Sequence, residues 1–453
     1  MQADLAEFVS AIPGATLSAP ARFRGVSTNS QTMEAGNLFV ALRGERFDAH
    51  DFLADVVARG AAAVVVDRVP AAFSLPALVV PDTRHALGQI AQVWRRRFAI
   101  PLIGVAGSNG KTTVKEMIAS ILVTAFGEDQ VLATRGNLNN EIGVPLTLFR
   151  LQANHRAAVI EMGMNHPGEI ARLAEIAAPT VGLVNNAQRE HQEFMASVAA
   201  VAEENGAVIR ALAGDGCAVF PADDDYASMW HGDAGARRKI TFGLQGDAGI
   251  TCHWQPLDFG SQLTIDAQGM RFDVSLSAAG VHNVRNALAA CAATLAIGID
   301  ARSIVRGLER FTPVAGRLQK KRATSGATVI DDTYNANPDS VRAAIDVLAA
   351  APSPRLLVLG DMGEVGDEGV AFHEEIGAYA RARQIDQLYS LGKLARHASL
   401  AFGSTARHFD DMEQLNDEVA RAPSGASVLV KGSRFMKMER VVQRLTGAQA
   451  GGH

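Results

Sequence analysis

The chain has 453 residues, of which 48% are hydrophobic and 20% charged, a composition typical of globular proteins that fold in water. Its length predicts about three domains. The formal net charge of −5 and the sequence pI near 6.2 exclude a general electrostatic attraction to nucleic acid or to acidic membrane surfaces.

Cysteine usage and apolar runs restrict the protein class further. The three cysteines, Cys217, Cys252 and Cys291, are widely spaced and show no metal-binding interval, so we expect ordinary thiols. The first residues lack the basic and apolar segments of a secretory signal, and no apolar run reaches the roughly 18 residues that span a bilayer. These features predict a cytoplasmic protein that does not insert into membranes.

Residues 1–98 have the pattern of a small α/β domain. Apolar runs at 37–42 and 61–67 predict strands, and residues 52–59 predict a helix between them. A further helix, predicted at 83–97, leads into the next segment.

In residues 99–312, predicted strands and helices alternate, which indicates a mainly parallel sheet with helices on both faces. The strands are expected at 101–106, 157–162 and 180–185, and the helices at 114–122, 167–178, 197–210 and 281–297. Short alternating runs within 249–277 predict antiparallel strands at an edge of this sheet.

A segment punctuated by proline and glycine, residues 313–318, predicts a linker to a third domain. Beyond it the alternation restarts, with strands expected at 327–331, 355–360, 386–390 and 427–431. The remaining length suffices for a doubly wound, Rossmann-like domain at 313–453. The sequence therefore predicts an α/β protein of three domains.

The segment Gly107-Ser-Asn-Gly-Lys-Thr-Thr113 lies between the predicted strand 101–106 and an amphipathic helix. A glycine-rich turn in this context lets backbone N–H groups and the helix N-terminus bind phosphate. The usual phosphate loop has a further glycine where this chain has Val105. A purely structural turn is the alternative, but the strand-turn-helix context favours a site for a nucleoside triphosphate. This segment makes residues 99–312 a predicted P-loop ATPase domain.

Several motifs together resemble the Mur ligase family of bacterial cell-wall synthesis, and they extend over nearly the whole chain. Besides the phosphate loop they are Gly136-Asn-Leu-Asn-Asn-Glu-Ile-Gly143, Glu161-Met-Gly-Met, His282-Asn-Val-Arg-Asn286, Gly316-Arg317, Asp332-Thr-Tyr-Asn-Ala-Asn-Pro338 and Gly360-Asp-Met-Gly-Glu364. The resemblance implies an ATP-dependent ligase that activates a carboxylate as an acyl phosphate before an amine attacks it.

Two strings, Tyr334-Asn-Ala-Asn-Pro338 and the one that begins at Gly136, resemble the branch that adds D-alanyl-D-alanine to a UDP-muramoyl-tripeptide. The resemblance thus implies these substrates, together with ATP and Mg²⁺, and an enzyme of peptidoglycan precursor synthesis. We expect a monomer, although no motif reports the oligomeric state. One alternative is another ligase of the same superfamily, either a folylpolyglutamate synthase or a Mur ligase that adds a single amino acid. A P-loop ATPase switch without ligation is another.

The resemblance also implies roles for individual residues around the nucleotide. Lys111 would bridge the β- and γ-phosphates, while Thr112, Glu161 and His191 would hold magnesium. The wider nucleotide site would comprise Gly107, Ser108, Asn109, Gly110, Thr113, Asn283, Asn286, Arg317 and Asp332. Bland alternatives exist: an ion-paired or helix-capping Glu161, a surface or core His191, and a helix cap at Asn283.

Substrate contacts are implied in the same way. Ser27, Asn29 and Ser30 would cradle the UDP part, and Asn137, Asn139 and Asn140 the muramoyl-peptide part. Tyr334, Asn335 and Asn337 would face the nucleotide and the incoming amine. Turn formation is the alternative for these polar residues. Lys431 and Arg434 could steady an anionic group or begin a solvated helix.

The chain departs from the family pattern in two places. Most members have a carbamylated lysine in the helix predicted at 197–210, where this chain has Asn205. Either Glu203 or Glu204 would supply the missing negative oxygen, or the second metal would have fewer protein ligands and more water. In the first domain, Asn29 and Gln31 replace the usual acidic and basic residues.

Overall fold

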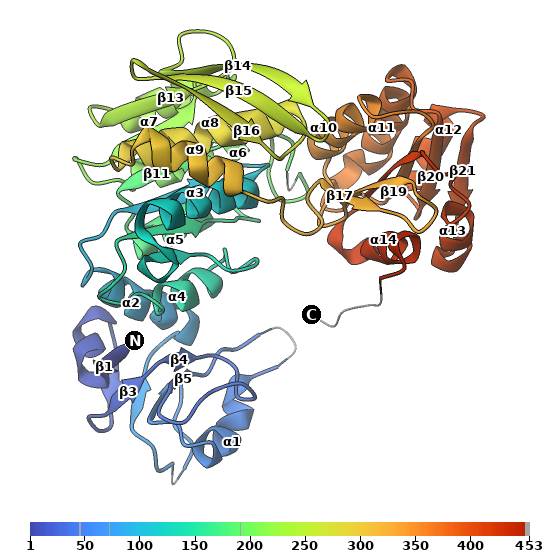
Figure 1. Ribbon diagram of the computed structural model, residues 1–453. Coiled ribbons are helices and arrows are strands. Elements are labelled where there is room, and N and C mark those ends of the chain that lie inside the picture. Colours follow the sequence, from blue (N-terminus) through green and yellow to red (C-terminus); the bar gives the residue numbers. More distant parts are fainter. Residues whose placement is uncertain (45–46, 72, 191, 449–453) are drawn as a thin grey trace.

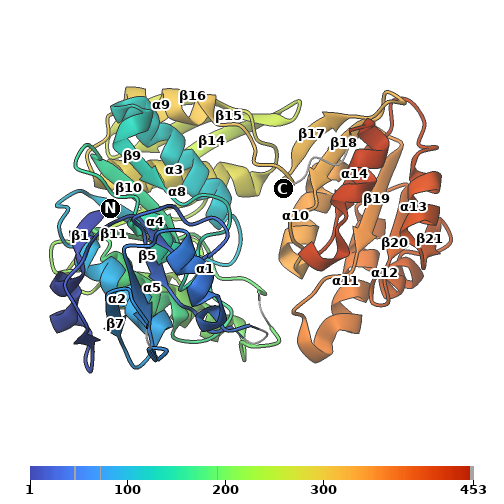
Figure 2. The same ribbon diagram turned by 90° about the horizontal axis from the view of Figure 1, so that it is seen from below.

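Three main β-sheets follow one another along the chain, and helices cover them (Figure 1). The computed structural model describes residues 1–44, 47–71, 73–190 and 192–448. The C-terminal sheet lies beside the central one in two perpendicular views (Figures 1 and 2). The predicted three-domain α/β fold is confirmed, while its boundaries at 98/99 and 312/313 stay predictions.

The N-terminal sheet has five strands in the order β2-β7-β6-β5-β4, and β1 pairs with β3 in a separate ribbon. The predicted strands at 37–42 and 61–67 are confirmed as β5 and β6, which are parallel and fully buried. The elements are β1 (Gln2–Asp4), β2 (Thr16–Leu17), β3 (Arg22–Arg24), β4 (Val26–Ser27), β5 (Leu38–Val40), α1 (Leu53–Ala58), β6 (Ala63–Val66), β7 (Ala77–Val79) and α2 (Thr83–Arg95).

The central sheet has nine strands in the order β16-β15-β14-β13-β12-β11-β8-β10-β9. It is parallel from β9 to β14, and β14, β15 and β16 form the predicted antiparallel edge. Its strands are β8 (Leu102–Ala106), β9 (Val131–Ala133), β10 (Ala157–Glu161), β11 (Val181–Val184), β12 (Cys217–Pro221), β13 (Arg238–Phe242), β14 (Ile250–Leu257), β15 (Gly260–Ala267) and β16 (Met270–Leu276). Its helices are α3 (Lys111–Phe126), α4 (Gly143–Leu148), α5 (Glu169–Ala177), α6 (Val198–Arg210), α7 (Ala227–Ala234), α8 (Val281–Ala296) and α9 (Ala301–Arg310).

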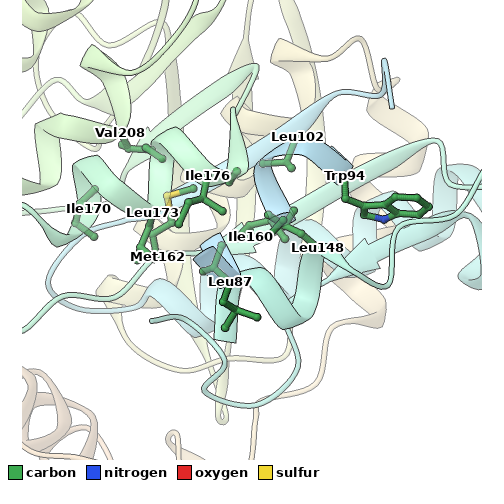
Figure 3. Packing of buried hydrophobic residues seen from close by; sticks show 14 of the residues in the cluster. Leu87, Trp94, Leu102, Leu148, Ile160, Met162, Ile170, Leu173, Ile176 and Val208 are labelled. Carbon is green, nitrogen blue, oxygen red and sulfur yellow. The ribbon is translucent and has the colours of Figure 1, made fainter. Parts of the chain in front are cut away.

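Alternation along β8 explains why both faces of this sheet are covered. Leu102 belongs to the apolar cluster beneath α2, α4, α5 and α6, whereas its neighbour Ile103 packs with α3, α8 and α9. Figure 3 shows the first cluster, in which Leu87 and Trp94 of α2 lie with residues of α4 and α5. Because β8 lies between β11 and β10, the segment that follows it emerges near the middle of the carboxyl edge.

The C-terminal sheet, in the order β17-β18-β22-β19-β20-β21, is parallel except for β17. Helices α10 and α11 cover one face and α13 and α14 the other, so the predicted doubly wound arrangement is confirmed. None of the helices in the described ranges is both long and apolar enough for a bilayer crossing. The elements are β17 (Gln319–Arg322), β18 (Thr328–Asp332), α10 (Pro338–Ala349), β19 (Arg355–Gly360), α11 (Gly369–Ala382), β20 (Gln387–Leu391), α12 (Ala395–Phe402), β21 (Ala406–Phe409), α13 (Met412–Val419), β22 (Ser427–Lys431) and α14 (Glu439–Thr446).

The hairpin of β14 and β15 connects the central and C-terminal parts. Phe259 at its tip packs against the apolar cluster beneath α10 and α11. Lys320 of β17 lies over the Phe259 ring, 5.0 Å from its centre, and its Nζ is 2.9 Å from a carboxylate oxygen of Asp258. The central sheet therefore reaches the C-terminal sheet through this hairpin as well as through the linker.

Gly307 of α9 fixes the position of α3, whose first turn belongs to the phosphate loop. A Cβ at Gly307 would overlap the backbone of Ile121, so we expect Gly307→Ala to lower the free energy of unfolding by about 2 kcal/mol. Chemical denaturation measures this change. Gly232→Ala in α7 is the control, because a Cβ there meets no described atom within 4 Å and alanine favours helix. Equal stability of the two variants would contradict the close packing of α9 on α3.

Candidate functional site

The phosphate loop has the backbone geometry that its glycines predict. Gly107 and Gly110 have φ of +136° and +80°, and a Cβ at Gly107 would press on the backbone nitrogens of Asn185 and Asn186. Among the described residues, no side chain caps the N-terminus of α3, which begins at Lys111. Its first N–H groups therefore keep their capacity to bind an anion.

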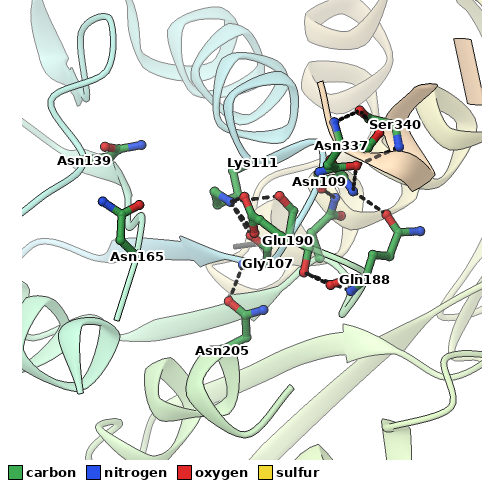
Figure 4. A network of polar contacts seen from close by, with 12 residues as sticks. Gly107, Asn109, Lys111, Asn139, Asn165, Gln188, Glu190, Asn205, Asn337 and Ser340 are labelled. Carbon is green, nitrogen blue, oxygen red and sulfur yellow. Dashed lines mark hydrogen bonds and ion pairs between the residues drawn. The ribbon is translucent and has the colours of Figure 1, made fainter. Parts of the chain in front are cut away.

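Among the described residues, the Lys111 ammonium has three partners at the mouth of this loop (Figure 4). Its Nζ donates to the carbonyl oxygens of Gly107 at 2.6 Å and Ser108 at 2.9 Å. The third partner is the Glu190 carboxylate, with its two oxygens at 2.9 and 3.2 Å. Lys111 is therefore matched in charge by a residue from the segment after β11.

A cavity of about 970 Å³ lies at the carboxyl edge of the central sheet and extends to the C-terminal part. Residues expected at the nucleotide and substrate line it, together with others from both parts. Of the predicted residues, it brings together Ser108, Asn109, Gly110, Lys111, Thr112, Thr113, Asn139, Asn140, Glu161, Asn283, Asn286, Arg317, Asp332, Tyr334, Asn335, Asn337 and Lys431. The predicted nucleotide residues therefore share one cavity, except Gly107, which precedes the lining residue Ser108 in the chain.

Glu161 ends β10 inside the cavity and is suited to bind a cation. The side chain is buried, with 2% exposure, and its Oε1 accepts a hydrogen bond from Asn139 Nδ2 at 2.8 Å. The other oxygen, Oε2, has no hydrogen-bond partner within the described part of the chain. Because a bare buried carboxylate oxygen is costly, this atom fits a metal ligand better than a cap or an ion pair.

The buried amides of α8 belong to a hydrogen-bonded chain that ends at the phosphate loop. Asn283 Nδ2 donates to the Ala279 carbonyl at 2.8 Å, and Asn286 Nδ2 donates to Asn283 Oδ1 at 3.1 Å. Asn286 Oδ1 accepts from Asn185 Nδ2, which also donates to the Asn109 carbonyl. Gly280, and not Asn283, is the N-cap of α8, so the capping alternative for Asn283 is wrong.

The linker and the carboxyl ends of β18 and β22 line the cavity from the C-terminal side. The Arg317 guanidinium lies over the Tyr334 ring at 4.1 Å from its centre. Asp332 receives a hydrogen bond from Lys431 Nζ at 2.5 Å, and Lys431 also donates to the Asn335 carbonyl. Lys431 is buried at the end of β22, so its interpretation as the start of a solvated helix is wrong.

Asn337 connects the two sides of the cavity (Figure 4). It is the N-cap of α10, where its Oδ1 accepts from the Ser340 N–H at 2.8 Å. Its Nδ2 donates to Asn109 Oδ1 of the phosphate loop at 2.9 Å. Asn337 is therefore a helix cap that also contacts the phosphate loop, and its role toward the substrates stays a prediction.

Other predicted residues lie outside the cavity. Ser27 and Asn29 bond to each other within the loop after β4, and neither they nor Ser30 are among the described residues that line the cavity. Asn137 is exposed, and Arg434 pairs with Glu439 at the surface. His191 lies outside the described residues. The UDP contacts and the role of His191 therefore stay predictions.

Asn205 occupies a different role from the lysine expected at its place. Its side chain is 1% exposed, and Oδ1 accepts the Gly107 N–H at 3.0 Å, so it supports the phosphate loop from below (Figure 4). Glu204 uses both carboxylate oxygens to accept N–H groups of Gly168 and Ile170 at the start of α5, at 2.8 and 2.7 Å. Glu203 is exposed. Neither glutamate therefore matches the expectation of a replacement ligand, which leaves the prediction of fewer protein ligands and more water.

The segment 185–190 is part of the site, although sequence reasoning assigned a role only to its neighbour His191. Arg189 lines the cavity and forms ion pairs with Glu375 of α11 and Asp339 of α10. Its hydrogen bonds to these two carboxylates raise the pKa of the guanidinium above its ordinary value. Burial lowers the pKa of His282, another lining residue, to about 4, so its imidazole is neutral at pH 7. The position of this segment after β11, at the ligand-binding edge, was the available signal.

Comparisons with known families cover most of the chain. Residues 22–95 match the model of the Mur ligase family catalytic domain, residues 105–294 that of the Mur ligase middle domain, and residues 316–434 that of the Mur ligase glutamate ligase domain. The matched ranges contain the phosphate loop and most lining residues of the cavity. Sequence and fold thus lead to one family.

Individual relatives agree with these matches. The chain is 38% identical to a UDP-N-acetylmuramoyl-tripeptide–D-alanyl-D-alanine ligase of Haemophilus influenzae, with 93% of each chain covered, and 38% identical to the Escherichia coli protein of the same name, with 97% and 98% covered. It is similar to crystal structures of MurF from Acinetobacter baumannii (TM-score 0.89, 35% identity, 94% of both chains) and of MurF from Thermotoga maritima with ADP (TM-score 0.85, 28% identity, 94% and 97%). The chain belongs to the Mur ligase family.

Proposed function

We propose that this protein joins D-alanyl-D-alanine to a UDP-N-acetylmuramoyl-tripeptide with ATP as the energy source, in peptidoglycan precursor synthesis. Relatives that bear this name match it over nearly the whole chain. The observation that carries the proposal is the position of Lys111 at one cavity shared by the central and C-terminal parts. A ligation with three reactants needs such a shared space, because the reacting groups must meet away from water.

The reaction begins with transfer of the γ-phosphoryl group to the tripeptide carboxylate, which becomes an acyl phosphate. The amine of the dipeptide then attacks the acyl carbon, and phosphate leaves. Both steps bring negative charges together, so Lys111 and the N–H groups at the start of α3 stabilise the charge that develops on the phosphates. Asn109 and Asn337 hold the phosphate loop and α10 in one arrangement.

Magnesium fits the residues around the phosphate loop. Thr112 supplies a hydroxyl and Glu161 a buried carboxylate oxygen that lacks a hydrogen-bond partner within the described residues. Magnesium keeps several waters and few protein ligands beside phosphates, which agrees with this sparse donor set. When bound, the ion would neutralise phosphate charge. His191 is a further proposed ligand, as the family resemblance implies.

The assembly and location of the enzyme belong to the same proposal. The active form that we propose is a monomer. We also propose that the enzyme acts in the cytoplasm, because its proposed substrates, ATP and a UDP-linked sugar, are cytoplasmic metabolites. We further propose three domains. Residues 1–98 would bind the UDP substrate, residues 99–312 would bind ATP, and residues 313–453 would bind the dipeptide and close over the nucleotide.

Ligation predicts a strict requirement for both organic substrates. We expect ADP release only when ATP, a UDP-muramoyl-tripeptide and D-alanyl-D-alanine are all present, and a product whose mass equals the two substrates minus water. Mass spectrometry and an ADP assay measure these results. Single amino acids and folylpolyglutamate substrates serve as controls for other ligases of the superfamily. Equal ADP release without an amine acceptor would favour an ATPase switch.

Lys111→Ala removes the cation at the phosphates, so we expect kcat/KM to fall by about 10³-fold with the fold intact. Steady-state kinetics measures the loss, and circular dichroism checks the fold. Lys239→Ala is the matched control, because Lys239 lies at the amino end of β13, away from the ligand edge of the sheet. Full activity of Lys111→Ala would remove this residue from the mechanism.

Glu161→Gln keeps the shape of the side chain but removes its charge, so a cation would lose its anionic ligand. We expect the Mg²⁺ concentration for half-maximal activity to rise by more than about tenfold. Magnesium titrations at fixed ATP measure this shift. Glu175→Gln on the exposed side of α5 is the control. An unchanged magnesium requirement would argue that Glu161 is not a ligand.

A further inference from the structure

Lys111 is neutralised by the protein itself in this structure. The exposed fractions of the Lys111 and Glu190 side chains are 13% and 12%, so their contact is largely shielded from water. Of the partners that the described residues give the Lys111 ammonium, two are neutral carbonyls and Glu190 carries the negative charge. A polyphosphate that approaches this ammonium must therefore compete with Glu190.

Arg189, which directly precedes Glu190 in the chain, contacts the C-terminal part. The Arg189 guanidinium donates to both oxygens of Asp339 and both oxygens of Glu375, at distances of 2.6 to 3.2 Å. The Arg189 N–H also donates to Asp339, at 2.9 Å. Glu375 in turn holds Arg342 of α10. The forked guanidinium of Arg189 is thus held between two carboxylates, Asp339 of α10 and Glu375 of α11.

Further contacts hold this segment on both sides. Gln188 accepts a hydrogen bond from Asn109 Nδ2 at 2.7 Å and so lies against the phosphate loop. The Glu193 N–H donates to the Glu364 carbonyl of the C-terminal part at 3.3 Å. We call residues 188–190 the strap, because they contact the phosphate loop on one side and α10 and α11 on the other.

We propose that Glu190 occupies Lys111 until a polyphosphate replaces it, and that this exchange loosens the strap and the Arg189 contact with the C-terminal part. The inference rests on the proposed binding of nucleotide at the phosphate loop. Phosphate oxygens bring more negative charge than one carboxylate, and they repel Glu190 at close range. Because Glu190 and Arg189 are adjacent, displacement of one shifts the anchor of the other.

Coupling of this kind acts in both directions. If release of Glu190 weakens the contact of Arg189, a weaker contact of Arg189 must also favour nucleotide binding by the same factor. Arg189 is then a positioning residue, because it changes nucleotide affinity through Glu190 and through the C-terminal part. A purely local ion pair of Lys111 with Glu190 would not transmit this effect.

Calorimetric titration with ADP and Mg²⁺ on the full chain tests the proposal without turnover. We expect Glu190→Gln to bind ADP about 5- to 50-fold more tightly than the parent protein. Arg189→Lys keeps the charge but loses the fork, so we expect tighter binding by about 2- to 5-fold. The double variant should gain less than the product of the two factors. Glu193→Gln, an exposed site three residues from Glu190, is the control for the loss of one negative charge.

Small-angle scattering supplies a second readout that a local ion pair would not move. We expect Glu190→Gln without ADP to give the profile of the parent protein with ADP, and the parent protein alone to differ from both. If Glu190→Gln and Arg189→Lys bind ADP like the parent, or if Glu193→Gln gains as much as Glu190→Gln, the proposal is overturned while the proposed function stands. If the parent binds no ADP, both are overturned.

Discussion

A cation held in a tight backbone turn needs an anionic partner, and in this protein that requirement falls on Lys111. The turn exists because Gly107 and Gly110 adopt backbone conformations that other residues rarely reach. Its amides are aligned by strand β8 and helix α3, which the two apolar clusters of the central sheet hold in place. The arrangement of the site follows from how this turn is held and from what balances its charge.

The turn is supported from three directions. Asn205 of α6 receives the Gly107 N–H from below, the segment after β11 holds Asn109 and Lys111 from the side, and Asn337 of α10 reaches Asn109 from the C-terminal part. Such preorganisation lets the amides meet a phosphate with little rearrangement of the loop itself. As a consequence, the geometry of the phosphate loop depends on the C-terminal part, which contributes one of its supports.

Sequence reasoning succeeded where a local pattern has a local cause. The strand, turn and helix around Lys111 follow from apolar periodicity and from glycine, and the antiparallel edge at 249–277 follows from alternation. It failed where the partner is distant in the sequence. Asn109 and Asn337, which form a hydrogen bond, are 228 residues apart, and Lys431 and Asp332, which form a buried ion pair, are 99 residues apart. No spacing rule relates such residues, since only the folded sheets bring them together. The roles of Arg189 and Glu190 were missed for the same reason.

The hairpin of β14 and β15 has a consequence for how the C-terminal part can move. Phe259 packs against the apolar cluster beneath α10 and α11, and the chain itself crosses near Gly316, so these two attachments are separate from the polar contacts of Arg189 and Asn337 at the cavity. If the contacts of Arg189 and Asn337 separate while these two attachments remain, the C-terminal part can rotate only about the axis through Phe259 and Gly316. Motion that keeps both attachments would open or narrow the 970 Å³ cavity along one direction, so reactants would enter and leave through the side opposite that line.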